Sequence, residues 1–248
     1  MKLAIITDIH EDLISLKEAL RQIEKYKCDE IIFLGDISGF NPPYYTYNET
    51  KNAHECLALI RSNCKTVILG NHDIYAGSVF PKNCSFFNFP DDWYELDYMQ
   101  RRKLSDDEIW LHEEHDLDPL YSAMDIEYLK SLPEYSVFRT ADLNILFSHY
   151  AYPNLSGIKK EFLAYKFQFH QHFSFMNSME CSISFIGHSH EKGFYTVTEN
   201  KMKNYKFGNL ELKFDPICIG LPPITSQQDR NGFCIFDVDE RSMQIIKL

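Results

Sequence analysis

Apolar runs and amphipathic stretches alternate along the first third of the chain. Residues 2–7 form a short apolar run, and residues 12–27, which follow, repeat leucine and isoleucine at helical spacing. The same order recurs with an apolar run at 30–34, an amphipathic stretch at 52–62 and an apolar run at 66–69. Strand–helix–strand alternation of this kind predicts a parallel α/β core.

The pattern changes between about residues 77 and 140, where aromatic and acidic residues are frequent. Two capping-box signals, Ser105 with Glu108 and Ser122 with Asp125, predict two short helices in this segment. A chain of 248 residues is long enough for one large α/β domain or for two small ones. We interpret 77–140 as a helical insertion over the core of a single domain of 248 residues.

Aromatic residues gather within this insertion. They are Phe86, Phe87, Phe89, Trp93 and Tyr94. Rings clustered in this way more often pack in a core than stack on nucleic-acid bases, so we expect them to be buried. A partial lid over a neighbouring site is the alternative, because aromatic insertions beside a cleft can shape substrate entry.

Short strands are predicted again after the insertion. Apolar runs at 144–147 and 182–186 flank a stretch at 159–179 that we expect to be helical. Four further runs toward the C-terminus predict short antiparallel strands joined by turns. These turns include Asn209 and the Asn231-Gly232 pair.

Composition limits the expected location and partners. No apolar run approaches the roughly 20 residues that a membrane helix needs, and the first run contains only four apolar residues before Thr7, too few for a secretory signal. The seven cysteines are scattered and form no C-x-x-C pair, so we expect reduced thiols in a cytoplasmic protein. A formal charge of −11 argues against a long nucleic acid as partner, although bound metal ions could make one cleft locally positive.

Side chains that can bind a metal follow directly after five of the apolar runs. The segments are AIITDIH, IIFLGD, TVILGNHD, NILFSHY and ISFIGHSH. Ligand sites of open α/β sheets lie outside the carboxyl ends of strands, so we expect the five segments to converge. Asp8 and His10 are two residues apart, as are His188 and His190, and an extended chain would turn each pair to one face.

Each of these segments taken alone is weak evidence. A single D-x-H match has a high false-positive rate, and a lone histidine after a strand is more often structural than a metal ligand. A purely structural interpretation of all five would require the same coincidence at five equivalent places. The set therefore predicts a metal site.

The ordered motifs resemble those of the calcineurin-like metallophosphoesterase superfamily. They are D-x-H at Asp8–His10, G-D-x-x-G at Gly35–Gly39, G-N-H-D at Gly70–Asp73, His149 after a strand, and G-H-x-H at Gly187–His190. GDISGFNPPYY and ICIGLPPITSQQDRNGFCIFDVD are similar to segments of its small bacterial and archaeal phosphodiesterase-like branch, with Leu221 in place of a serine. The resemblance implies an α/β fold, a four-layer α/β/β/α sandwich of two mixed sheets flanked by helices.

The resemblance also implies two metal ions that share one carboxylate. The first would be bound by Asp8, His10, Asp36 and His190, and the second by Asp36, Asn71, His149 and His188. Imidazole and carboxylate ligands suit divalent transition metals, and we expect manganese first, with iron, cobalt, nickel or zinc as alternatives. Such a pair would activate a bridging hydroxide for direct attack on phosphorus. Neutral Asn71 would keep the site electropositive for an anionic phosphoryl group.

His72 is not among these metal ligands. The resemblance implies that it binds the substrate together with Asn71, either by contacting the phosphoryl group or by protonating the leaving oxygen as a catalytic residue. The alternative is a histidine that stabilises its loop. Gly39 and Phe40 stand where the serine/threonine protein phosphatase branch has an acid and an arginine. Without that guanidinium fork, we expect a preference for singly charged diesters over dianionic monoesters.

Other charged and imidazole side chains give weaker signals. Lys192 and Arg230 are candidate phosphate contacts, each with a single charge. We interpret the remaining histidines as structural or solvated. They are His54, His112, His115, His170 and His172.

The sequence thus predicts a metal-dependent phosphoesterase that hydrolyses phosphodiesters or small phosphorylated metabolites. One alternative is a nucleotide or dinucleoside polyphosphate hydrolase, which the negative charge does not exclude. Another is a protein-binding scaffold of the same fold without catalysis. A scaffold is expected to have lost one or more ligands, and all seven ligand positions are filled here.

Overall fold

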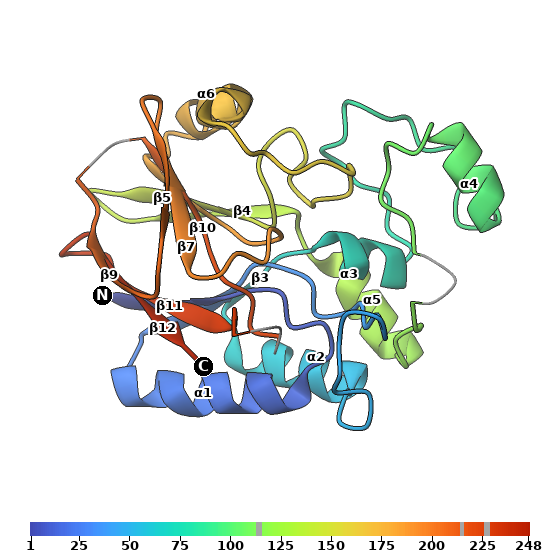
Figure 1. Ribbon diagram of the computed structural model, residues 1–248, viewed down its shortest axis with the longest axis horizontal. Coiled ribbons are helices and arrows are strands. Elements are labelled where there is room, and N and C mark those ends of the chain that lie inside the picture. The colour runs from blue at the N-terminus through green and yellow to red at the C-terminus, as the bar shows by residue number, and fades with distance from the viewer. Residues whose placement is uncertain (113–115, 214–215, 226–228) are drawn as a thin grey trace.

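The computed structural model describes residues 1–112, 116–213, 216–225 and 229–248. Two mixed six-stranded sheets pack against each other between outer layers of helices (Figure 1). The strand order is β3-β2-β1-β11-β12-β9 in the first sheet and β4-β5-β6-β10-β7-β8 in the second. The expected four-layer α/β sandwich is confirmed.

The elements have the following bounds. The first sheet contains β1 (Lys2–Ile6), β2 (Glu30–Phe33), β3 (Thr66–Val67), β9 (Gly208–Glu211), β11 (Gly232–Asp237) and β12 (Ser242–Lys247). The second contains β4 (Tyr135–Arg139), β5 (Asn144–Ser148), β6 (Ile183–Ile186), β7 (Phe194–Val197), β8 (Met202–Tyr205) and β10 (Ile217–Gly220). The described helices are α1 (Leu13–Tyr26), α2 (Ala53–Asn63), α3 (Asn71–Ala76), α4 (Tyr98–Leu104), α5 (Ala123–Ser131), the 3₁₀ helix η1 (Lys166–Phe169) and α6 (His170–Ser178).

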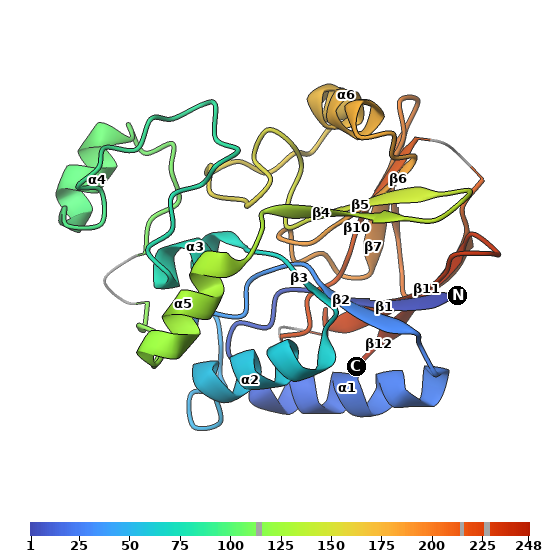
Figure 2. The same cartoon turned by 180° about the vertical axis from the view of Figure 1, so that it is seen from behind.

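Each sheet contains three adjacent parallel strands. β1, β2 and β3 run parallel in the first sheet, and β5, β6 and β10 run parallel in the second. Parallel neighbours need crossover connections, which α1 and α2 supply on the outer face of the first sheet and α6 on the outer face of the second (Figure 2). Asp12 caps α1 by accepting the backbone N–H of Ser15, and the helix ends at Lys27 in the left-handed conformation.

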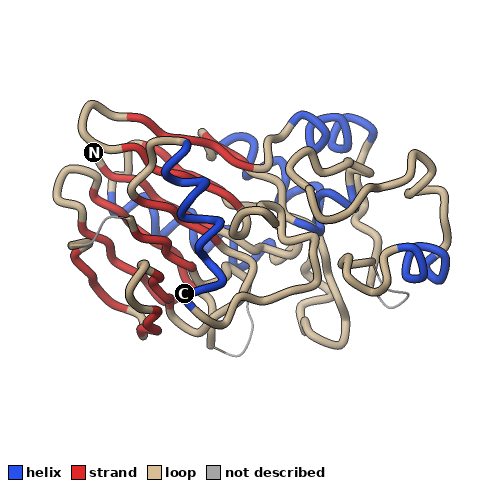
Figure 3. Tube along the Cα trace, turned by 90° about the horizontal axis from the view of Figure 1, so that it is seen from above, coloured by secondary structure: helices blue, strands red, loops and turns tan. Residues whose placement is uncertain are grey.

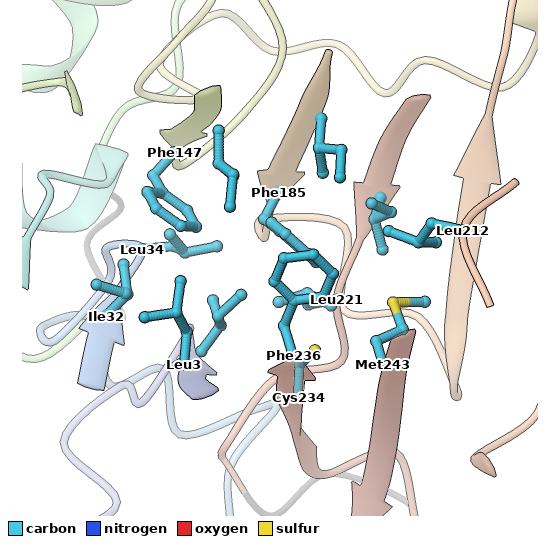
Figure 4. Packing of buried hydrophobic residues seen from close by; sticks show 14 of the residues in the cluster. Leu3, Ile32, Leu34, Phe147, Phe185, Leu212, Leu221, Cys234, Phe236 and Met243 are labelled. Carbon is cyan, nitrogen blue, oxygen red and sulfur yellow. The ribbon is translucent and has the colours of Figure 1, made fainter. Parts of the chain in front are cut away.

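The main hydrophobic core lies between the two sheets. Figure 4 shows Leu3, Ile32 and Phe236 of the first sheet facing Phe147 and Phe185 of the second. The Phe185 ring meets Phe236 edge to face at a centroid distance of 5.2 Å. Each fully buried phenylalanine contributes about 1.5–3 kcal/mol relative to exposure. This packing holds the two sheets face to face.

The insertion contains helices, though not where both sequence signals suggested. Ser122 caps α5, as predicted, in a capping box with Asp125. Ser105 does not begin a helix, which corrects the sequence interpretation. It is the C-cap of α4, and the capping box that begins α4 is formed by Asp97 and Gln100. Figures 1 and 3 show α4 and the loops beside it extending beyond the strands, at the end of the molecule away from both termini, whereas β4, at the end of the predicted insertion, is a strand of the second sheet.

Two further expectations need correction. Helical structure in 159–179 begins only at Lys166, and Lys159 itself forms an antiparallel bridge with Ile109 of the insertion. Asn209 lies within β9 rather than in a turn. None of the described helices has the length and apolarity needed to cross a bilayer. All seven cysteines fall within the described ranges and are free thiols.

Candidate metal centre

The predicted metal ligands converge where strands of both sheets end. β1, β2 and β3 lead into Asp8, Asp36 and Asn71 from the first sheet, while β5 and β6 lead into His149 and the His188 loop from the second. Groups of ligand atoms within 4.8 Å of one another include Asp8, His10 and His190, and separately Asp36, His149 and His188. The convergence expected from the strand ends is confirmed, with the difference that the edge belongs to two facing sheets.

The first group consists of Asp8, His10 and His190. The Nε2 atoms of His10 and His190 are 3.0 Å apart, and His190 Nε2 lies 3.2 Å from Asp8 Oδ1. His10 Nε2 is 3.9 Å from the same oxygen. Three donor atoms therefore face one point, an arrangement that suits a divalent transition metal.

The second group is centred on Asp36. Its Oδ2 lies 3.3 Å from Nε2 of His149, which in turn is 3.2 Å from Nδ1 of His188. The same Oδ2 is 3.9 Å from Nε2 of His10 in the first group. The Asp36 carboxylate thus lies between both groups.

Backbone and hydroxyl groups orient these ligands from behind. Nδ1 of His10 is 3.1 Å from the carbonyl of Gly39, and Nδ1 of His149 is 2.9 Å from the carbonyl of Leu34. Each contact turns the Nε2 atom of the ring toward the centre. Asp8 Oδ2 accepts hydrogen bonds from the Thr7 hydroxyl at 2.6 Å and from the His188 backbone N–H at 3.0 Å. Such outer contacts are typical of metal-binding imidazoles and carboxylates.

Two buried polar atoms beside the centre provide a test of whether a cation fits. Asn71 is the first residue of α3 and is 2% exposed, and its Oδ1 is buried. Within the described part of the chain, neither this oxygen nor Nδ1 of His72 has a hydrogen-bond partner. An unsatisfied buried polar atom costs about 1–3 kcal/mol. A cation held by Asn71, His149 and His188 would satisfy the amide oxygen, so the residues present fit the implied metal.

Charge interactions within the cluster shift the acidities of its members. Burial opposes ionisation of Asp8, but the imidazoles of His190 and His149 outweigh it and lower the pKa of the carboxyl. Burial likewise opposes ionisation of Asp36, yet His149 and His72 lower its pKa. Both carboxylates are therefore charged near neutral pH.

The imidazoles divide into two kinds. Burial lowers the pKa of His10 to about 4, and burial lowers the pKa of His188 to about 3, so both rings are neutral donors of a lone pair. Burial also opposes protonation of His149, but Asp36 and Asp8 raise its pKa to about 9. Metal binding at His149 would therefore release a proton.

The loops that carry the ligands have an uncommon backbone conformation. The ligands with φ in the left-handed region are Asp8 (53°), His10 (48°), Asp36 (61°), His188 (68°) and His190 (48°). The prediction that Asp8 with His10, and His188 with His190, lie on extended chain is therefore wrong, although both pairs still face the centre. Left-handed residues other than glycine cost energy and concentrate at functional sites, where the surrounding structure holds them.

Gly39 sets the space available to His72. Gly39 has φ +102°, and a Cβ atom there would lie 2.0 Å from Nδ1 of His72. An acid at this position, as in the protein phosphatase branch, would displace the imidazole. Phe40, at the position of the branch's arginine, is fully buried and packs against Tyr45 and Tyr47. Gly39 and Phe40, which differ from the protein phosphatase branch, are therefore both required by their packing contacts.

His72 is closer to the metal ligands than a substrate contact needs to be. A donor atom of His72 lies within 4.8 Å of those of His10 and Asp36. Its backbone N–H donates to Asp36 Oδ1 at 3.0 Å, and its ring contacts the indole of Trp110 at a centroid distance of 4.1 Å. Burial lowers the pKa of His72 to about 3, so the ring is neutral near pH 7 and can donate an N–H to a phosphoryl oxygen.

Asp73 was not singled out by the sequence, yet it joins two of the ligand loops. Its carboxylate accepts backbone N–H groups from Asp36 at 2.8 Å, Ile37 at 3.0 Å and Gly70 at 3.2 Å. The Ser38 backbone N–H and hydroxyl also donate to it. The available signal was an acid at the third position of a helix that begins directly after Gly70.

Glu11 is a second buried acid that the motif left unassigned. It accepts the backbone N–H groups of Gly39 and Phe40, and it forms an ion pair with Lys51 at 3.2 Å. These bonds hold the loop whose Gly39 carbonyl orients His10.

A cavity of about 270 Å³ opens onto the centre. Besides several of the predicted ligands, its lining consists of His72, Ser189, Tyr44, Tyr45, Trp110, Phe162 and Arg230. Arg230 donates to the His190 carbonyl at 3.4 Å, whereas Lys192 is exposed and is not part of the lining.

The insertion thus contributes Trp110 to this cavity, but its other aromatic residues behave differently. Trp93 is 2% exposed, and the partly buried rings of Phe86, Phe87, Phe89 and Tyr94 pack in the same separate cluster. Packing of this group in a core is therefore confirmed, although of the five rings Trp93 alone is fully buried.

The other histidines of the described ranges do not line this cavity. His172 is fully buried and contacts the Ser184 hydroxyl at 3.0 Å, while His170 and His54 are exposed. His112 is not solvated as expected, because it stacks on Tyr75 at 4.3 Å. His115 lies outside the described residues.

Two mixed sheets with carboxylates and imidazoles gathered at their strand ends define an α/β protein with a candidate metal centre. A family model described as calcineurin-like phosphoesterase matches residues 1–192, which include all seven predicted ligands. The chain belongs to the calcineurin-like phosphoesterase family.

Individual relatives agree with this assignment at the level of the fold. A curated uncharacterised protein of Methanocaldococcus jannaschii is 24% identical over 257 residues, covering 99% of this chain and 86% of its own length. The crystal structure of a metallophosphoesterase from Sphaerobacter thermophilus matches with a TM-score of 0.65 at 20% identity, over 100% of this chain and 88% of that one. A hypothetical protein of Pyrococcus horikoshii matches with a TM-score of 0.60 at 16% identity, over 100% and 87%.

Proposed function

We propose that the chain is a dinuclear metal-dependent phosphoesterase that hydrolyses phosphodiesters or small phosphorylated metabolites. The observation that carries the proposal is the position of Asp36, whose Oδ2 lies 3.3 Å from His149 of one donor group and 3.9 Å from His10 of the other. A carboxylate between two sets of imidazoles is suited to bridging two cations. Membership of the phosphoesterase family supports the same chemistry.

The charges of the site favour an anionic phosphoryl group once cations are bound. Two divalent ions, manganese in the first instance, would activate water and neutralise developing charge on the phosphoryl oxygens. The protein supplies two carboxylates, Asp8 and Asp36, so two such ions would leave a net charge of about +2. Asn71 and the neutral ring of His72 add polar contacts without adding negative charge.

A preference for diesters follows from the side chains that face the centre. Gly39 leaves room only for the His72 ring, and Phe40 is buried, so this loop provides no guanidinium for a dianionic monoester. Arg230, near the C-terminal end of the chain, contributes one cationic side chain to the lining of the cavity. Without a guanidinium on this loop, the site lacks the bidentate contact that would hold the second negative charge of a monoester, and this favours a singly charged diester.

The test combines metal content with hydrolysis. We expect about two divalent ions per chain in the purified protein, and faster hydrolysis of bis(p-nitrophenyl) phosphate than of p-nitrophenyl phosphate after addition of Mn, Ni, Zn or Mg. Asp36→Asn should remove activity and bound metal, whereas Asp91→Asn, at an exposed acid, should retain both. Absence of metal and activity with every ion would overturn the enzyme proposal. Equal rates on the two esters would overturn only the diester preference.

A further inference from the structure

Aromatic rings from three separate segments border the cavity of the candidate metal centre. Tyr44 follows β2, Trp110 lies in the insertion, and Phe162 follows β5. Tyr44 and Phe162 are each 66% exposed. Large apolar side chains left open beside a polar centre are informative, because their exposure forgoes the stabilisation that burial would provide.

Phe162 is held in a defined orientation over one ligand. Its ring stacks on the imidazole of His188 at a centroid distance of 5.2 Å and an interplanar angle of 19°. One face of the phenyl ring therefore lies on the metal ligand, while most of the side chain remains open to solvent. An open aromatic face next to a phosphoryl site can stack on a flat ring of the substrate.

The insertion and the loop after β5 are joined, so Trp110 and Phe162 are positioned together. Trp110 donates its backbone N–H to the carbonyl of Ile158 at 2.7 Å, and Lys160 donates to the carbonyl of Glu108 at 2.7 Å. These bonds flank the antiparallel bridge between Ile109 and Lys159. The side chain of Trp110 is positioned by the contact of its ring with the imidazole of His72.

The loop after β5 is also braced from within. The Asn154 side chain donates to the Lys159 carbonyl at 3.0 Å and accepts the Lys159 backbone N–H at 2.9 Å. Asn154 is 1% exposed. The open ring of Phe162 therefore projects from a braced segment of the chain.

We propose that this aromatic rim is a subsite for a flat aromatic group of the substrate, with a nucleoside base, joined through its sugar to the phosphate, as the chemical class. The part concerning the phosphate rests on the proposed function. The cavity of about 270 Å³ lies just below the range for small-molecule sites, roughly 300–1,000 Å³, so the base would stack at its rim, where Tyr44 and Phe162 are exposed. Arg230 and the metal ligands would face the phosphate, while Phe162 and Trp110 face the base.

Binding of adenosine and of ribose to the full-length chain, measured by calorimetry, tests the subsite without requiring hydrolysis. We expect saturable binding of adenosine and none of ribose. Phe162→Leu should weaken adenosine binding about tenfold, because base stacking on an aromatic side chain contributes on the order of that factor. The matched control is Phe167→Leu, since Phe167 is 68% exposed and lies close by in sequence but does not line the cavity.

The outcomes separate the two proposals. No adenosine binding, or equal binding by the wild type and Phe162→Leu, overturns the subsite whatever the hydrolytic activity. Adenosine binding that depends on Phe162 supports it even if no phosphoester is hydrolysed, a result that would overturn the proposed function instead. With active protein, adenosine monophosphate should inhibit diester hydrolysis at about tenfold lower concentration than ribose 5-phosphate does. Equal inhibition would contradict the subsite.

Discussion

Gly39 and His72 approach so closely that a Cβ atom on Gly39 would lie 2.0 Å from Nδ1 of the imidazole. The glycine also has φ +102°, a conformation that other residues rarely adopt. Because Gly39 has no side chain, the loop after β2 can pack directly against His72 at the start of α3. The difference from the protein phosphatase branch at residue 39 is a steric requirement of this site.

Gly39→Ala should therefore impair both stability and activity. The methyl group would displace His72 and strain the backbone, with an expected loss of about 1–3 kcal/mol in the free energy of unfolding and at least tenfold in turnover. Urea unfolding and diester hydrolysis measure the two effects. Gly208→Ala is the control, because Gly208 also has positive φ (+143°) but a Cβ there meets open space. Equal losses in the two variants would show that contact with His72 is unimportant.

The two H-x-H pairs of the chain should respond differently to substitution. His190→Gln removes a donor atom that lies 3.0 Å from His10 and 3.2 Å from Asp8, so bound metal and activity should fall by more than the roughly 10–100-fold that an outer contact costs. His170→Gln, at an exposed histidine of the other pair, should leave both unchanged. Metal analysis and hydrolysis provide the measurements. Retention of metal by His190→Gln would remove His190 from the ligand set.

His72→Asn distinguishes a substrate contact from a metal ligand. If the neutral imidazole donates to the phosphoryl group, turnover should slow at least tenfold while bound metal remains at the wild-type level. Metal content and kcat are measured on the same preparation. Loss of metal in proportion to activity would instead make His72 a ligand, which its distance from His10 and Asp36 allows.

Asp73→Asn should destabilise the protein although the volume of the side chain is unchanged. Replacing one carboxylate oxygen by an NH₂ group would leave either the N–H groups of Asp36 and Gly70, which donate to Oδ2, or that of Ile37, which donates to Oδ1, without an acceptor, and leaving such buried groups unsatisfied costs about 1–3 kcal/mol each. Urea unfolding measures the loss, with Asp91→Asn as an exposed control. A variant as stable as the wild type would contradict the role of Asp73 in joining the two loops.

His172 should make stability dependent on pH. Burial lowers the pKa of His172 to about 3 from 6.5, so between these values the unfolded chain binds a proton that the folded chain does not. Stability therefore falls as the pH is lowered, by about 1.4 kcal/mol for this group between about pH 7.5 and 5.5.

Urea unfolding at both pH values tests the contribution of His172. His172→Gln should lose about 1.4 kcal/mol less than the wild type over this interval, whereas His170→Gln should match the wild type. An equal pH dependence in His172→Gln would assign the effect to other groups.

Much of the candidate site was predictable because its ligands follow strands directly. The apolar runs before Asp8, Asp36, Asn71 and His149 are buried strands, and parallel strands that share a sheet end at the same edge. The helix after β1 was equally predictable, since Asp12 and Lys27 cap its two ends through local contacts. Signals of this kind operate within a few residues.

Other features depended on contacts that local signals do not encode. Ser105 with Glu108 satisfies the same capping pattern as Asp97 with Gln100, and the packing of the insertion selected the second pair. The start of the expected helix at 159–179 is instead extended, because residues 158–160 pair with 108–110. In each case, contacts with residues distant in sequence outweighed the local helix signal.

The amino-acid sequence by itself determined the order of strands and helices, the identity of the seven candidate ligands and their meeting at strand ends, because periodicity and strand direction require no knowledge of distant contacts. Only the tertiary structure decided how the ligands are held. The left-handed turns at Asp8 and His188, the carboxylate of Asp73 between two loops, and Trp110 against His72 all arise from groups far apart along the chain. Their positions are set by packing between two sheets and an insertion, and that packing exists only when the chain has folded.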